Sequence, residues 1–166
     1  WSASVSSPSE ITPVTRALDQ LGIPYRFFRH PGAVSSLEQA ARERGQRPEQ
    51  IIRSILFRLA EEEYVMVLVA GPRQVDWPTL RRYLGITRMT MASEEEVLSA
   101  TGYLLGAVSP FGLPQPLRIL ADESIFGEAE VSIGSGVRHS TIILRQEHLQ
   151  QALGAVERGV FAYDKS

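Results

Sequence analysis

The spacing of apolar residues predicts a short helix near the start of the chain. Four apolar residues recur at helical spacing, namely Val14, Ala17, Leu18 and Leu21. Thr12 suits the N-cap position, Pro13 suits the first turn, and Gly22 lets the chain leave the helix. We therefore expect a helix over residues 13–21.

Capping patterns predict further helices. Ser35 and Glu38 form a capping-box pattern, and Ser93 and Glu96 form another. Asp76 is a suitable N-cap before a third amphipathic segment. The expected helices cover residues 36–44, 77–84, 94–99 and 146–153.

Alternating and continuous apolar runs predict strands elsewhere. Residues 51–59 and 64–70 are typical of an antiparallel pair joined by an acidic turn. Arg53, Ile55 and Phe57 share one face of the first strand, and Ile52, Ser54, Leu56 and Arg58 share the other. The second strand is apolar almost throughout, which predicts burial on both faces. Shorter strands are expected over residues 23–29, 88–91, 117–121, 130–133 and 141–144.

The order of these elements indicates the fold class. Strands and helices do not alternate regularly, which excludes a doubly wound fold. We expect a single mixed α/β (α+β) domain over residues 11–166, whose mixed, mostly antiparallel curved sheet is flanked by helices. Residues 1–10, WSASVSSPSE, are rich in Ser and Pro and predict a flexible N-terminal arm.

Composition excludes several kinds of chemistry. The chain has no cysteine, so thiolate catalysis and Cys-ligated zinc are excluded. Its 3 histidines lack metal-binding spacing, and we expect neither a metal site nor a cofactor. No apolar run approaches the roughly 20 residues that a membrane helix needs, so we expect no membrane partner and a cytoplasmic protein.

The net charge of −2 means that the surface as a whole does not attract nucleic acid. A nucleic-acid partner therefore needs a local basic patch. Two clusters are available, and each suits a solvated helix face equally well: Arg42, Arg44 and Arg47, and Arg81, Arg82 and Arg88.

The segment TGYLLGAVSPFGLP, Thr101 to Pro114, is the most informative stretch for function. Its glycines allow positive φ angles and the close approach of a ligand, and Pro110 stiffens it. A long loop of this composition inside a compact domain is more often functional than passive, although a structural crossover remains the alternative.

This loop resembles the signature loop of the YbaK/prolyl-tRNA-synthetase-associated family of editing domains. The pattern stands here as Thr101-Gly102, then Gly106, then Pro110-Phe111-Gly112. The resemblance extends from Thr12 to about Leu153 and includes SLEQAARERG, VDWPTLRRYLG, MASEEEVLSATGY, ILADES and the turn Gly134-Ser135-Gly136. Several motifs in the family's order make this a specific match.

The resemblance implies a trans-acting hydrolase, a deacylase that cleaves the ester of mischarged tRNA, most often tRNA-Pro carrying a small wrong amino acid. Its partners would be aminoacyl-tRNA and, transiently, a tRNA synthetase. Such editing is needed because a pocket discriminates by only about 1–3 kcal/mol per methylene. The alternatives are a catalytically silent relative that binds the tRNA 3′ end or a nucleotide-like ligand, and a hydrolase of other small aminoacyl esters.

The resemblance also implies site residues. Catalytic roles are expected for Arg53 and Gly112, with Arg53 standing where active relatives carry a lysine. Arg is planar and stays charged, so this exchange is not conservative. We expect substrate binding by Thr101, Gly102, Gly106, Ser109, Pro110, Phe111, Gly134, Ser135, Gly136 and His139.

The remaining polar residues carry weaker signals. His30 precedes Pro31-Gly32 and is predicted to be a solvated loop histidine. Ser135 lies between glycines, but the pattern is not the G-x-S-x-G nucleophile elbow. A covalent serine hydrolase is therefore not expected.

Overall fold

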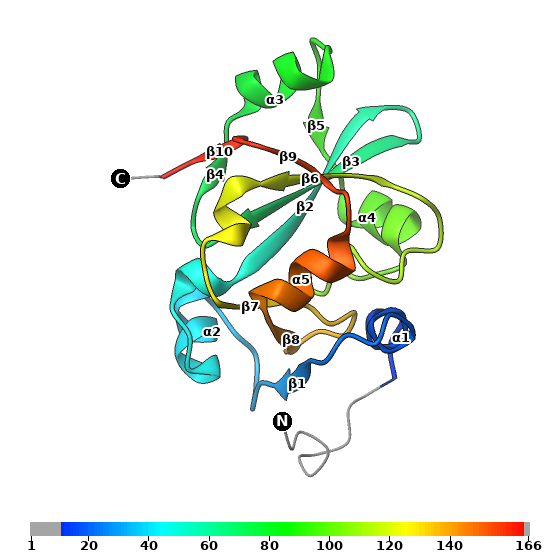
Figure 1. Cartoon of the computed structure of the whole chain (residues 1–166). Coiled ribbons are helices and arrows are strands. Elements are labelled where there is room, and N and C mark those ends of the chain that lie inside the picture. The colour runs from blue at the N-terminus through cyan, green and yellow to red at the C-terminus, as the bar shows by residue number, and fades with distance from the viewer. Residues whose placement is uncertain (1–10, 165–166) are drawn as a thin grey trace.

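A mixed five-stranded sheet forms the centre of the molecule in the computed structural model, which describes residues 11–164 (Figure 1). In spatial order its strands are β5 (Thr90–Met91), β2 (Ile52–Ala60), β3 (Glu63–Ala70), β6 (Arg118–Asp122) and β9 (Glu157–Gly159). The pairs β5–β2 and β2–β3 are antiparallel, whereas β3–β6 and β6–β9 are parallel. The predicted arm, residues 1–10, lies outside the described residues.

A second, antiparallel sheet lies against the start of β2. It consists of β1 (Arg26–Arg29), β8 (Ser140–Arg145) and β7 (Glu130–Gly134), in that order. A parallel bridge between Ile51 and Ser132 joins the two sheets. A third pair, β10 (Ala162–Tyr163) with β4 (Gln74–Val75), completes the strands. The predicted mixed α/β class is confirmed.

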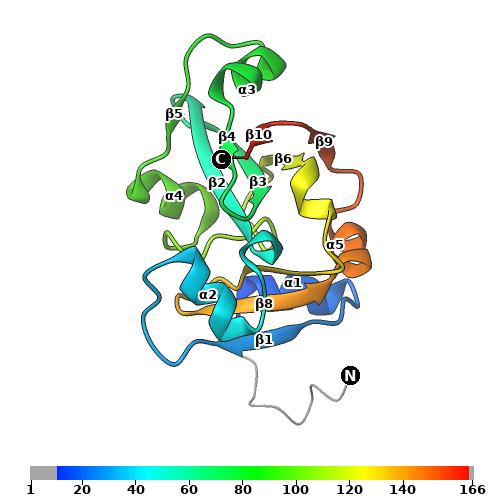
Figure 2. The same ribbon diagram turned by 90° about the vertical axis from the view of Figure 1, so that its left-hand side faces the viewer.

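Five helices surround these sheets, namely α1 (Pro13–Gln20), α2 (Leu37–Arg44), α3 (Trp77–Leu84), α4 (Glu94–Thr101) and α5 (Gln146–Leu153). Figure 2 and Figure 1 agree in placing α3 at one end of the molecule and α2 with β1 at the other. The predicted caps Thr12, Asp76 and Ser93 all accept hydrogen bonds from backbone N–H groups.

The alternation of β2 divides the core into two clusters, as the sequence predicts. Ile52 and Leu56 pack on the face shared with α1 and the second sheet. Phe57 packs on the opposite face, beside α3. All residues from Val65 to Ala70 of β3 are buried, which confirms burial on both faces.

Two sequence predictions about local structure are wrong. Ser36, not Ser35, caps α2, because its Oγ accepts the N–H of Gln39 at 3.0 Å. The strand expected over residues 23–29 begins only at Arg26. Ile23 is still held by the exit of α1, since its N–H donates to the carbonyl of Leu18 at 2.9 Å.

Glycines in the loop between α4 and β6 and in β7 allow this loop to pack closely against its neighbours. Gly112 has a φ of +71°, and a Cβ there would lie 2.4 Å from the carbonyl oxygen of Pro13. A Cβ on Gly134 would lie 2.0 Å from the carbonyl oxygen of Val108. Buried Tyr103 donates its hydroxyl to the carbonyl of Phe111 at 2.5 Å. These contacts seat the loop between α1 and β7.

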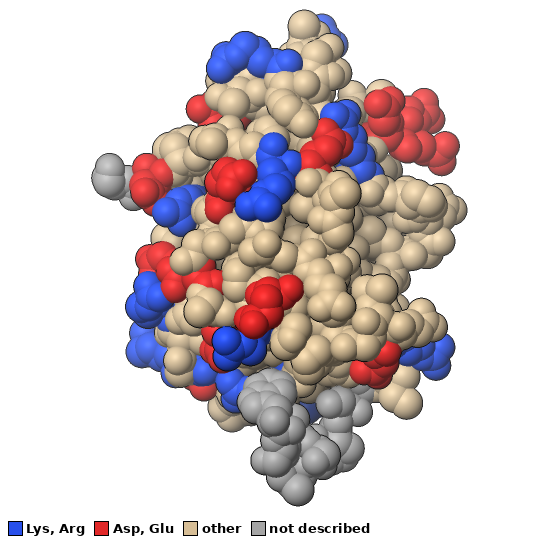
Figure 3. Space-filling view, viewed as in Figure 1, with Lys and Arg blue, Asp and Glu red and all other residues tan. Residues whose placement is uncertain are grey.

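Two parts of the face seen in Figure 3 carry charge of one sign. Basic side chains gather over α3, and acidic side chains gather over the turn between β2 and β3. Across residues 11–164, no helix is long and apolar enough to cross a membrane.

We expect acid to weaken the surface link between α3, β6 and β9. Glu157 accepts hydrogen bonds from Arg118 at 2.8 Å and from Tyr83 at 2.7 Å, and these bonds lower its pKa from 4.5 to about 2. Stability from a lowered carboxyl pKa is present above the unfolded pKa and is lost as pH falls towards the folded value. Glu157→Gln should therefore lower the free energy of unfolding at pH 7 by about 1 kcal/mol or less, because the pair is exposed.

Denaturant unfolding of the wild type and of Glu157→Gln, from pH 7 to pH 2, measures this difference. It should shrink between about pH 5 and pH 2. Glu61→Gln, on the exposed turn, is the control. A constant difference at every pH would contradict the assignment.

Gly112→Ala should destabilise the fold more than Gly106→Ala. Both glycines have positive φ angles, which cost an alanine about 1–2 kcal/mol. A Cβ at Gly106 meets nothing within 4 Å, whereas one at Gly112 collides with Pro13 and adds about 1–3 kcal/mol of overpacking. Thermal and denaturant unfolding of both variants measures the difference. Equal losses would show that the loop moves freely away from α1.

Candidate functional site

A cavity of about 190 Å³ lies where the start of β2 meets β7, β8 and the loop before β6. The end of α2 closes one side, and residues 105–108 of the loop close another. Its polar lining consists of Arg44, Arg53, Ser54, Ser132, Ser140 and Thr141. We call this space the inner cavity.

A second hollow of about 320 Å³ adjoins the inner cavity. We call it the outer groove. The two spaces share Arg44, Leu105, Gly106 and Ser140, and the outer groove adds His30, Val34, Arg138 and His139. Together they offer a small chamber with a wider entrance.

Gly106 lies at the boundary of the two spaces with its backbone exposed to both. Its φ is +92°, and a side chain would meet nothing within 4 Å. Its N–H makes no hydrogen bond to any of residues 11–164. A free backbone donor in this position is suited to stabilise negative charge on a bound oxygen atom.

The floor of the inner cavity is polar. Ser132 is fully buried, and the hydroxyl of Thr141 donates to the carbonyl of Ile133 at 2.7 Å. The buried Oγ of Ser54 has no hydrogen-bond partner within the described part of the chain. An unpaired buried hydroxyl costs about 1–3 kcal/mol, so this atom marks a place for a polar ligand group.

Arg44, which is partly buried, and His30, which is buried, form a hydrogen-bonded pair beside the two spaces. Arg44 Nε donates to His30 Nε2 at 3.0 Å, and Arg44 Nη1 donates to Ser132 Oγ at 2.8 Å. His30 Nδ1 lies 2.6 Å from Glu43 Oε1. Because Nε2 accepts, Nδ1 carries the proton and the imidazole is neutral. Burial lowers the pKa of Arg44 to about 10, so the guanidinium stays charged at neutral pH.

The prediction that His30 is solvated is therefore wrong. Its side chain is 5% exposed. A histidine before a Pro-Gly turn is usually exposed, but the end of α2 folds back over this one. Arg44 likewise is not part of a solvated helix face.

Arg53 lines the inner cavity, and its guanidinium donates two hydrogen bonds to backbone carbonyls of the chain. Nε donates to the carbonyl of Gly71 at 2.8 Å, and Nη2 donates to the carbonyl of Arg73. These carbonyls belong to the turn between β3 and β4. Burial lowers the pKa of Arg53. Its predicted catalytic role stays a prediction, and the geometry gives it a structural role in holding this turn.

The structure brings some of the other predicted residues to the site. Gly106 and Gly134 line the inner cavity, and His139, with a φ of 65°, lines the outer groove. The linings of both spaces lack Thr101, Gly102, Ser109, Pro110, Phe111, Gly112, Ser135 and Gly136.

The side chains of three of these other residues form hydrogen bonds within the chain. Thr101 is buried and donates its hydroxyl to the carbonyl of Val97 at 2.6 Å. Ser109 Oγ accepts the N–H of Phe111 at 3.2 Å, and Ser135 Oγ lies 2.6 Å from Ser140 Oγ. Their contact with substrate stays a prediction.

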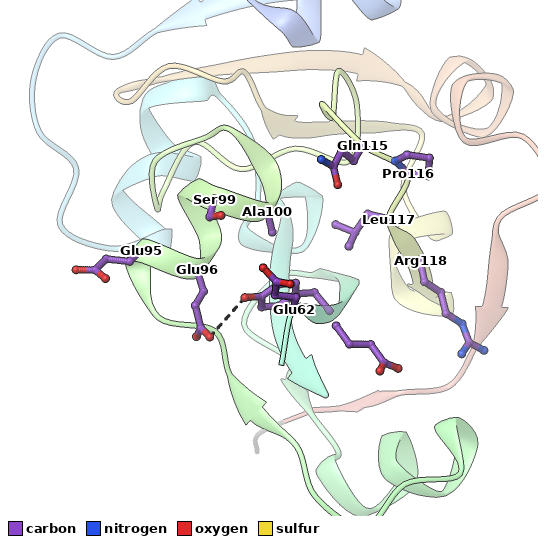
Figure 4. A pocket seen from close by; sticks show the side chains of 11 residues that line it. Glu62, Glu95, Glu96, Ser99, Ala100, Gln115, Pro116, Leu117 and Arg118 are labelled. Carbon is purple, nitrogen blue, oxygen red and sulfur yellow. Dashed lines mark hydrogen bonds between the residues drawn. The ribbon is translucent and has the colours of Figure 1, made fainter. Parts of the chain in front are cut away.

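A larger hollow of about 820 Å³ lies elsewhere, between the β2–β3 turn and α4. Figure 4 shows Glu62, Glu95 and Glu96 around it. Arg118 also lines it, but its guanidinium is paired with Glu157. Clustered carboxylates repel the phosphates of a nucleic acid, so size alone does not make this hollow the site.

No cluster of His, Asp and Glu side chains able to hold a metal ion occurs in the part of the chain that the structure describes. Sequence reasoning missed Ser54 and Ser132 as site residues, because isolated serines in strands carry no motif. It placed Arg44 in a basic cluster for nucleic-acid contact but missed its position at the cavity, although a signal existed. Ala40 and Ala41 are buried on α2, and Arg44 follows at helical spacing on the same face.

Known proteins resemble this chain in sequence and in fold. The family model "Aminoacyl-tRNA editing domain" matches residues 30–152. The prolyl-tRNA editing protein ProX of Acetoanaerobium sticklandii is 24% identical over 86% of this chain and 89% of its own length. The proline–tRNA ligase of Aquifex aeolicus is 31% identical over 59% of this chain, and the match spans 17% of that ligase.

A solved structure gives the same fold. It is described as a candidate trans-editing enzyme for prolyl tRNA synthetase, and its TM-score to this chain is 0.80 at 26% identity, covering 93% of this chain and all of the other. The family match contains β2, the loop before β6 and the strands that enclose the inner cavity. The chain therefore belongs to the aminoacyl-tRNA editing domain family.

Proposed function

We propose that this protein is a trans-acting deacylase that hydrolyses the ester of mischarged tRNA, with tRNA-Pro carrying a small wrong amino acid as its substrate. The observation that carries the proposal is the inner cavity, whose 190 Å³ and polar floor suit a small amino acid. The outer groove is suited to the terminal adenosine. The names of the editing protein ProX and of the solved relative, both of which refer to prolyl-tRNA, support the choice of tRNA.

The chemistry needs water and donors to the carbonyl oxygen. Water adds to the carbonyl carbon, and the bond from that carbon to the ribose oxygen breaks. A proton from the water passes to the ribose oxygen, which releases the free amino acid and a tRNA with a free hydroxyl. The unpaired N–H of Gly106 is placed to donate to the negatively charged oxygen in the transition state.

Electrostatics favours approach from the end of the molecule that holds α2. The larger hollow is lined by Glu62, Glu63, Glu95 and Glu96, which belong to the β2–β3 hairpin and α4 and do not line the inner cavity. We propose that the protein works in the cytoplasm, where aminoacyl-tRNA is made, and that its contact with a tRNA synthetase is transient.

We expect the wild type to hydrolyse Ala-tRNA-Pro, and to leave Pro-tRNA-Pro at least tenfold less affected, because the inner cavity is small. Single-turnover hydrolysis of tRNA-Pro charged with Ala, Ser, Cys or Pro measures this preference. Hydrolysis of none of these, with tight binding of the tRNA, would show a binding module instead. Hydrolysis of simple aminoacyl esters but not of the tRNAs would show a different substrate class.

Arg53 is tested in the same assay. Because its donors are already bonded to two carbonyls, we expect Arg53→Ala to lower the free energy of unfolding by about 1–3 kcal/mol. The deacylation rate of the folded variant should fall less than tenfold. Arg53→Lys, which keeps a donor, is the matched control. A fall of about 100-fold or more with unchanged stability would instead make Arg53 a catalytic residue.

A further inference from the structure

In the proposed mode of binding, the amino acid occupies the inner cavity, the ribose occupies the outer groove, and the ester that joins them lies at the boundary. Among residues 11–164, only Arg44, Leu105, Gly106 and Ser140 line both spaces. Of these four residues, Arg44 is the one with a charged side chain.

The guanidinium of Arg44 is held rigidly and still has free donors. Two of its N–H groups bind His30 Nε2 and Ser132 Oγ. Its Nη2 group makes no hydrogen bond to residues 11–164. A guanidinium is planar and has five N–H donors, so hydrogen bonds at Nε and Nη1 fix its plane and with it the direction of the Nη2 donors.

His30 holds Arg44 without repelling it. The neutral imidazole accepts from Arg44 while its Nδ1–H faces Glu43, and Gln39 Nε2 donates to the same carboxylate at 2.9 Å. An imidazolium has no acceptor and would push the guanidinium away. The chain Gln39, Glu43, His30, Arg44 thus runs from the surface of α2 to the cavity.

Arg53 and Arg44 differ in their acceptors and in the spaces that they line. Arg53 donates from Nε and Nη2 to backbone carbonyls and lines the inner cavity. Arg44 donates from Nε and Nη1 to side chains and lines both spaces.

Building on the proposed deacylation, we propose that Arg44 is a catalytic residue whose Nη2 group donates to the ester carbonyl oxygen, and that His30 is the residue that positions it. As water attacks, negative charge grows on that oxygen. The fixed guanidinium meets this charge together with the N–H of Gly106, and no proton leaves the arginine.

The first experiment is single-turnover hydrolysis of Ala-tRNA-Pro at saturating enzyme. We expect Arg44→Met to lower the rate about 100-fold, in line with the loss of one oxyanion donor, with little change in tRNA affinity. Guanidinium ion added to Arg44→Ala should restore part of the rate. Arg16→Met, at an exposed arginine of α1 outside both linings, is the control and should react like the wild type.

His30 is tested by a conservative pair. His30→Gln keeps an acceptor for Arg44 and should retain most of the rate, whereas His30→Phe should lose it. A wild-type rate in Arg44→Met would overturn the proposal. Two further results together would also overturn it: guanidinium ion fails to restore activity to Arg44→Ala, and His30→Gln loses as much activity as His30→Phe. That pattern means a structural role.

A second experiment needs no variant to fold and no reaction to occur. The probe is 3′-deoxy-3′-(alanylamino)adenosine, which replaces the ester by a stable amide. Its binding to the wild type should shift the NMR resonance of the Arg44 Nε–H and leave that of Arg16 in place. Saturation without a shift would overturn the contact.

The experiments distinguish a failure of the deacylase proposal from a failure of the proposed contact between Arg44 and the ester. A wild type that shifts the Arg44 resonance but hydrolyses no aminoacyl-tRNA refutes the deacylase and keeps the contact. A wild type that hydrolyses Ala-tRNA-Pro with Arg44 unmoved refutes the contact and keeps the deacylase. Failure to bind the probe at all, together with no hydrolysis, refutes both.

Discussion

The site exists because residue 134 has no side chain. A Cβ there would lie 2.0 Å from the carbonyl oxygen of Val108, well inside the contact distance of any two heavy atoms. Without it the loop rests directly on β7, and Gly106 lines the inner cavity. Within the loop itself, Gly112 fits closely against Pro13 and keeps the loop in that place.

The second sheet then supplies the polar side of the site. The bridge from Ile51 to Ser132 brings β7 against the start of β2, so that the hydroxyls of Ser54 and Ser132 line one cavity. Arg44 closes this cavity from α2. Its buried charge is tolerated because a neutral His30 and the Ser132 hydroxyl accept from it. Packing and chemistry therefore depend on the same contacts.

Much of the fold follows from local rules. Caps such as Asp76 and Ser93, and the alternation along β2, depend on neighbours a few residues away, so the sequence alone predicts them. The short strands β4, β9 and β10 escaped prediction for the opposite reason. They are held by distant partners: the carboxylate of Asp122, for example, accepts the N–H groups of Phe161 and Ala162.

The same distinction between local and distant contacts applies to the candidate site. Local patterning identified the loop, its glycines and the family, because those features are spelled out in consecutive residues. Which arginine lines both spaces was decided by tertiary contacts. Arg53 carries the motif position and is bonded to the carbonyls of Gly71 and Arg73, whereas Arg44 lines the inner cavity and the outer groove. Side-chain direction depends on acceptors that the chain brings together only when it folds, and no spacing in the sequence reports them.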